Sequence, residues 1–84
     1  MGEARSDLID GLAKHVGVPP LTSAEIESLL ALAAAAAHGT GDRTSAPLAS
    51  FLAGVAAAGT EDRLAVLDDV RRTVAELAPA AEAS

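Results

Sequence analysis

The chain has 84 residues, of which half are nominally hydrophobic, and a formal net charge of −6. A chain of this length forms one small domain that buries about 60% of its unfolded surface. The acidic balance argues against a nucleic-acid partner, which Lys and Arg would have to bind, and the absence of cysteine excludes disulfides and the common structural zinc sites.

The first predicted helix covers residues 6–16, and Ser6 is placed to cap it. Its large apolar side chains recur at helical spacing and form one stripe, which consists of Leu8, Ile9, Leu12 and Val16. Gly17 ends the helix. The following Val18-Pro19-Pro20 predicts an extended link, because a residue before proline is kept out of the α region. We expect the stripe to pack on the helices that follow.

The second predicted helix covers residues 23–38 and begins at a capping box, Thr22-Ser23-Ala24-Glu25. Its buried stripe is expected to contain Ile26, Leu29, Leu30, Ala33 and Ala37, widened by Leu32 and Ala36. The opposite side carries Ala31, Ala34 and Ala35, so no charge interrupts the helix between Glu27 and His38. Three readings stay open: this face lies inside the fold, a second copy covers it, or it is plain alanine surface.

The third predicted helix covers residues 46–58, after Gly39 and Gly41 have ended the second. Ser45 is its expected cap, and Pro47 suits its first turn. The predicted buried stripe consists of Leu48, Phe51, Leu52 and Val55. The other side is small, with Ser50, Gly54 and Ala58 at every fourth position, which favours close approach of a second helix.

The fourth predicted helix covers residues 61–78, with Gly59 ending the previous one and Thr60 as the cap. Its apolar arc is the clearest in the chain and consists of Leu64, Leu67, Val70, Val74 and Leu77. Pro79 stops this helix, and residues 79–84 are predicted to be a frayed tail. With no strand pattern and short loops, the sequence predicts an all-α, compact four-helix domain over residues 1–78.

One group of polar residues between the second and third helices can bind a ligand. His38, Arg43 and Ser45 lie beside a helix N-terminus, where backbone amides and the helix dipole attract a phosphate or carboxylate. The same residues also have structural explanations, because His38 suits a helix C-terminus and Arg43 can pair with Asp42. We find no catalytic constellation and no metal-ligand cluster, and we expect no cofactor.

Nothing in the chain predicts a membrane segment. The longest apolar run, residues 29–37, is far short of the ~20 residues that span a bilayer. The N-terminus lacks the apolar stretch of a secretory signal. We therefore expect a cytoplasmic protein with no membrane partner.

The centre of the chain resembles a known small domain. The resemblance rests on Ala36-Ala37-His38, Arg43 and the run from Ala46-Pro47-Leu48 to Gly54. These residues are similar to a domain of unknown function common in high-GC Gram-positive bacteria, found alone or appended to molybdenum cofactor guanylyltransferase. The resemblance implies an association with molybdopterin guanine dinucleotide synthesis.

Two functional hypotheses follow. The favoured one is a non-enzymatic helical interaction module, accessory to molybdenum cofactor maturation, with a protein partner or a second copy. Its interface is expected on the small and alanine-rich faces, at Ala31, Ala34, Ala35, Ser50 and Gly54. The alternative is a binding domain for a small anion, such as a phosphate, nucleotide or oxyanion, that uses His38, Arg43 and Ser45.

Overall fold

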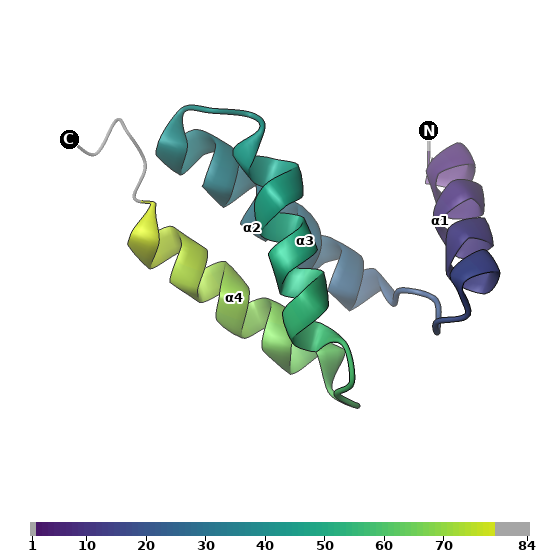
Figure 1. The fold of residues 1–84 in the computed structure, drawn as a ribbon. Helices are drawn as coiled ribbons and strands as arrows, with labels where there is room; N and C mark the ends of the chain where they lie inside the picture. Colours follow the sequence, from purple (N-terminus) through teal and green to yellow (C-terminus); the bar gives the residue numbers. More distant parts are fainter. Residues whose placement is uncertain (1, 79–84) are drawn as a thin grey trace.

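Within residues 2–78, the part that this computed structural model describes, four helices follow one another and there is no strand (Figure 1). They are α1 (Gly2–Val16), α2 (Ser23–Thr40), α3 (Ser45–Ala57) and α4 (Arg63–Leu77). The predicted all-α four-helix domain is confirmed. The predicted bounds are wrong by a few residues, most of all at α1, which begins at Gly2 rather than near Ser6. The domain limits 1–78 stay a prediction, and the predicted stop at Pro79 and tail at 79–84 lie outside the described residues.

The capping box at the start of α2 is confirmed. Thr22 Oγ1 accepts a hydrogen bond from the Glu25 amide at 3.1 Å, and the Thr22 amide donates to Glu25 Oε1 at 2.8 Å. Two otherwise unpaired amides of the first turn are thereby satisfied. At the start of α4 the predicted cap is wrong: Asp62, not Thr60, accepts the amide of Ala65 through its Oδ1, at 3.1 Å.

The two glycines at the end of α2 have different roles. Gly41 ends the helix in the left-handed conformation, at φ 73°, and its amide donates to the Ala37 carbonyl at 2.9 Å. Gly39 lies inside the helix, contrary to the prediction. A Cβ atom at Gly39 would overlap the backbone carbonyl of Ala78, so this glycine lets the last turn of α2 touch the end of α4.

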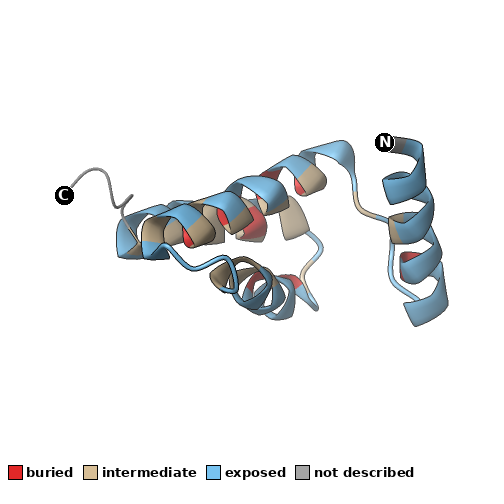
Figure 2. Cartoon of the chain, turned by 90° about the horizontal axis from the view of Figure 1, so that it is seen from above, coloured by how far each residue is buried: buried red, intermediate tan, exposed pale blue. Residues whose placement is uncertain are grey.

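The core lies between α2, α3 and α4. Its fully buried members are Leu32, Ala53, Ala57 and Leu67, and Leu29, Ala49, Val66 and Val70 pack around them. Figure 2 shows the buried residues along the inner sides of these three helices. The predicted stripe of α2 is therefore rotated, because Leu32 and Ala36 are buried while Leu30 is exposed. In α4 the predicted arc holds except at Leu77, which is exposed.

The prediction for α3 is wrong, because the helix presents its large side chains to the outside. Ala53 and Ala57 are buried with Ala49 beside them, on the side that meets α2 and α4. The side chains predicted to be buried are 57–70% exposed; they are Leu48, Phe51, Leu52 and Val55. Alanines four residues apart let α3 lie close to both neighbours, and Leu32 and Leu67 fill the space between them. We call these four exposed residues the outer face of α3.

Helix α1 stands apart from the other three (Figure 1). Among the described residues, no Cα atom of α1 lies within 8 Å of a Cα atom in another helix. Among residues 3–16 only Ala13 is buried; of the predicted stripe Ile9 is half-buried, and Leu8, Leu12 and Val16 are exposed. The expected packing of this stripe on the following helices is therefore not found. The molecule is correspondingly long, measuring 42 × 29 × 18 Å.

Candidate functional site

The predicted ligand site lies in the hinge between α2 and α3, and its polar groups are bonded to one another. Asp42 Oδ1 accepts the amide of Thr44 at 2.9 Å and its hydroxyl at 2.7 Å. These two bonds, the hydroxyl first, lower the pKa of the Asp42 carboxyl below its ordinary value. The hinge is therefore a turn held by its own hydrogen bonds, in which the Asp42 carboxylate is charged.

The N-terminus of α3 has few amides left for a ligand. The Ser45 amide donates to the Asp42 carbonyl at 3.0 Å, and the Ala46 amide donates to the Arg43 carbonyl at 3.1 Å. Pro47, next in the helix, has no amide hydrogen. Ser45 does not cap the helix as predicted. Its hydroxyl lies 2.9 Å from the hydroxyl of Thr40, which also donates to the Ala36 carbonyl at 2.7 Å.

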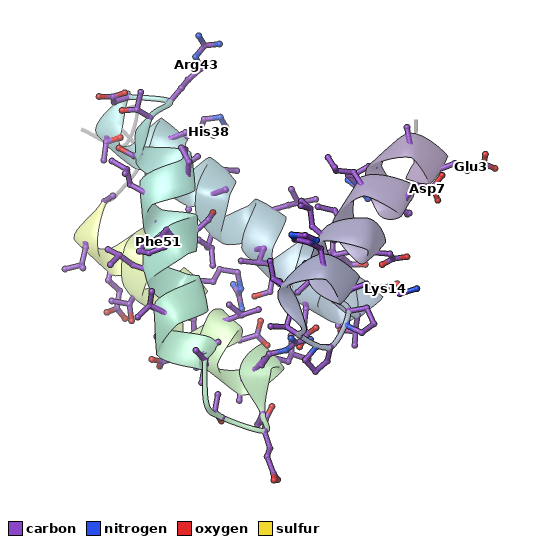
Figure 3. All side chains as sticks on the ribbon, turned by 45° about the vertical axis from the view of Figure 1, so that its right-hand side comes forward. Glu3, Asp7, Lys14, His38, Arg43 and Phe51 are labelled. Carbon is purple, nitrogen blue, oxygen red and sulfur yellow. The ribbon has the colours of Figure 1, made fainter. Side chains whose placement is uncertain are left out.

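The hinge does not bring the three predicted ligand residues together. Figure 3 shows the Arg43 side chain extending away from the helices and the His38 side chain pointing in a different direction. Both side chains are exposed. Among the described residues Arg43 makes no ion pair, so the predicted pairing with Asp42 is not found. The His38 and Arg43 side chains would have to change conformation before they could contact the same ligand.

The residues of the predicted interface lie on two different surfaces. Ala31 and Ala34 are exposed on α2 and Ala35 is half-buried, while Ser50 is half-buried and Gly54 exposed on α3. Ala31 borders a shallow hollow between α2 and α4, where the Ser28 hydroxyl donates to Asp68 Oδ1 at 2.7 Å. Ser50 and Gly54 instead border a groove on the other side of the core.

That groove is apolar and runs beside the outer face of α3. It has a volume of about 560 Å³, and its walls come from α2, α3, α4 and the link that precedes α2. Its main apolar lining residues are Val18, Leu21, Leu29, Pro47, Phe51 and Leu67. Between Ser45 and Ala57, α3 carries no charged residue, so neither the outer face nor this wall of the groove presents a charge. Together they form an exposed apolar surface on α3.

The sequence held a signal for this surface. Ala49, Ala53 and Ala57 recur every four residues, as a closely packed seam requires, and the large side chains lie opposite them. The apolar pattern nevertheless predicts the large residues inside, because burying a large apolar side chain stabilises a fold more than burying alanine. Because α2 and α4 lie close to α3, only its alanines fit between them, and the large side chains point outward.

Arg63, at the first position of α4, closes the far end of the groove. Its Nε and Nη2 donate to the two carboxylate oxygens of Glu25 at 2.9 and 2.8 Å. Its Nη1 and Nη2 also donate to the carbonyls of Pro19 and Pro20, at 3.1 and 3.0 Å. This Arg63 clamp joins α4, α2 and the link from α1. The Arg63 hydrogen bonds lower the pKa of the almost fully buried Glu25, against the opposing effect of burial.

Two further properties bear on function. No three His, Cys, Asp or Glu side chains of residues 2–78 are grouped so that they could hold a metal ion. None of the described helices is both long and apolar enough to cross a membrane.

The comparisons with known proteins give a family and no closer relative. No curated protein and no solved structure matches the chain. A family described as a domain of unknown function, DUF6457, matches residues 2–84, which is almost the whole sequence. The chain therefore belongs to the DUF6457 family.

Proposed function

We propose that this domain is a non-enzymatic interaction module that binds a protein through the outer face of α3 and the adjoining groove. The supporting observation is that four large apolar side chains of one helix are 57–70% exposed while its alanines are buried. In a monomer this arrangement leaves large apolar side chains in water, which costs free energy. Large exposed apolar patches commonly mark interaction sites.

The geometry suits a helical partner. An amphipathic helix laid along a groove contacts it through residues on one face, at spacings of three and four. Phe51 lies where the outer face meets the groove, so an aromatic anchor stands near the middle of the surface.

A co-purification experiment in the native host tests this surface. Tagged wild type is compared with Phe51→Glu and with Ala75→Glu, a matched control on the exposed side of α4. We expect Phe51→Glu to lose the partner and Ala75→Glu to keep it, with unchanged circular dichroism in both. Equal recovery from all three proteins would refute the assignment. Ala31→Glu, added to the set, tests the predicted alanine interface in the same way.

We further propose that the partner acts in molybdenum cofactor maturation. This step rests on the resemblance of residues 36–54 to a domain that accompanies molybdenum cofactor guanylyltransferase. Deletion of the gene is expected to lower molybdoenzyme activity in the host, and Phe51→Glu should not restore it. Full molybdoenzyme activity in the deletion strain would remove this part of the proposal and leave the binding surface in place.

Anion binding at the hinge is the alternative function, and Arg43, exposed and without an ion pair among the described residues, is what supports it. The self-bonded amides and the charge of Asp42 weigh against it. Calorimetric titration with phosphate, nucleotides and molybdate decides the question. Saturable binding that Arg43→Ala abolishes would establish the hinge as a site.

A further inference from the structure

Helix α1 has an apolar side that the rest of the described chain leaves mostly exposed. Figure 3 shows Glu3, Asp7 and Lys14 pointing away from the other helices. The opposite side of α1 carries Leu8, Leu12 and Val16, each at least half exposed. A helix with separate charged and apolar sides normally lies against another surface.

The outer face of α3 matches this stripe in length and in chemistry. α1 has 15 residues and α3 has 13, so at 1.5 Å per residue both are about 20 Å long. Because α3 carries no charge, α1 can pack there without burying a charge on the α3 side. Arg5, at the N-terminal end of the stripe, can extend its guanidinium to water.

The structure keeps α1 away from α3 of its own chain. The Val18 amide donates to the Ala13 carbonyl at 3.0 Å and the Gly17 amide to the Lys14 carbonyl at 3.3 Å, so a Schellman motif fixes the end of α1. The Arg63 clamp then holds the Pro19 and Pro20 carbonyls. Swinging α1 onto its own α3 would require these bonds to break.

Two apolar hollows lie beside α2, one next to α1 and one next to α3. A cavity of about 160 Å³ between α1 and α2 shares Leu21 and Leu29 with the groove beside α3. Ile9 lines the cavity beside α1, and Phe51 lines the groove beside α3.

We propose that α1 of a second copy of this chain covers the outer face of α3. This inference rests on the proposed function, because it assigns a binding partner to the same surface. Two copies related by a two-fold axis place each α1 on the outer face of the other's α3, so both unpaired faces are covered by one reciprocal contact. Each copy contributes seven large apolar side chains that are at least half exposed, which suits the ~800 Å² per partner of a standard interface.

Sedimentation equilibrium of the full chain tests the association. Wild type is expected to be a dimer at micromolar concentration. Leu12→Glu on α1 and Phe51→Glu on α3 should each raise the dimer dissociation constant at least about 30-fold, as for the loss of an interface hot spot. Ala75→Glu serves as the control and should leave the constant unchanged. A wild type that stays monomeric at several hundred micromolar overturns the proposal.

Thiol cross-linking identifies the occupant, because the chain has no cysteine of its own. Leu12→Cys and Phe51→Cys proteins are mixed and treated with a short bis-maleimide, and the linked peptides are read by mass spectrometry. Links between position 12 of one chain and position 51 of the other are expected to dominate. A double variant that links within one chain, or a dimer linked only between like positions, contradicts the arrangement.

These results separate the two proposals. If the wild type is monomeric and Phe51→Glu loses a partner in the host, the dimer proposal is refuted. The interaction surface on α3 is then kept. A dimer that Phe51→Glu leaves intact removes the arrangement proposed here, because the outer face of α3 then lies outside the contact, and the co-purification experiment then tests the interaction surface by itself.

Discussion

At the scale of single residues, the Arg63 clamp joins three parts of the fold: α4, the start of α2 and the link from α1. Only arginine can place three nitrogens on a carboxylate and two carbonyls at once, because its donors form a rigid planar fork. Thr22 and Glu25 lie three residues apart, so their capping box is a local pattern that the sequence predicts. Glu25 and Arg63 are 38 residues apart, and only the packing of α4 against α2 brings them together.

Glu25 is expected to make stability depend on pH. The pKa of its carboxyl is lowered in the folded protein, so its contribution is fully present above the unfolded pKa of about 4.3 and is lost as the pH falls through the folded value. Glu25→Gln should cost about 2 kcal/mol at neutral pH, since it weakens charge-assisted bonds. Urea unfolding from pH 7 to pH 3 should show the two proteins converging below about pH 4.3. A constant difference over this range would contradict the lowered pKa.

Gly39 gives a second test at this scale. Gly39→Ala is expected to destabilise the domain by roughly 1–3 kcal/mol, because the added methyl group meets the Ala78 backbone and α4 must move. The matched control is Gly54→Ala, where the methyl group meets nothing within 4 Å and the gain in helix propensity is about 0.5–1 kcal/mol. Thermal unfolding of both variants should therefore shift in opposite directions.

At the scale of elements, the existence and type of all four helices follow from the sequence, but the orientation of α3 does not. The apolar periodicity, the glycines at 17 and 41 and the capping box are local signals, and they place the helices within a few residues. Which side of α3 turns inward depends on how closely α2 and α4 approach it. That distance belongs to the packed domain, so the alanines at 49, 53 and 57 decide the orientation only once α2 and α4 are in place.

The inverted packing of α3 predicts opposite responses at adjacent positions. Ala53→Leu should destabilise by roughly 1–3 kcal/mol, because the alanine is fully buried against Leu32 and Leu67. Leu52→Ala removes an exposed side chain and should change monomer stability by less than about 0.5 kcal/mol. Denaturant unfolding at low protein concentration, where the chain is monomeric, measures both. If Leu52→Ala lowers the free energy of unfolding more than Ala53→Leu does, Leu52 is buried, as the sequence predicts, and the inverted orientation is wrong.

At the scale of the whole molecule, the four helices divide into a packed group of three and a separate α1. Both parts carry an exposed apolar face, since Leu8, Leu12 and Val16 are exposed on α1 and the outer face is exposed on α3. The sequence predicted an interaction surface and placed it on the small residues of α2 and α3. Ser50 and Gly54 border the groove, and the outer face beside it consists of large residues because the alanines at 53 and 57 are buried.

Hydrogen exchange should report the same division. Amides of α1 are expected to exchange quickly at low concentration, since almost no buried apolar contact protects the helix, whereas those of α2 near Leu32 should approach global protection. Raising the protein concentration should slow exchange in α1 and leave the Leu32 region unchanged, because association orders only the former. Exchange in α1 that is slow and independent of concentration would mean that α1 is held within its own chain.

The alanine seam of α3 also affects how the domain can diverge. The inner positions 49, 53 and 57 admit only small residues, so selection for folding acts on them and leaves the outer positions largely free. A lineage can therefore replace Leu48, Phe51, Leu52 or Val55 with little loss of monomer stability. The choice of binding partner can then change through substitutions on the outer face of α3, while the packing of the three helices stays the same.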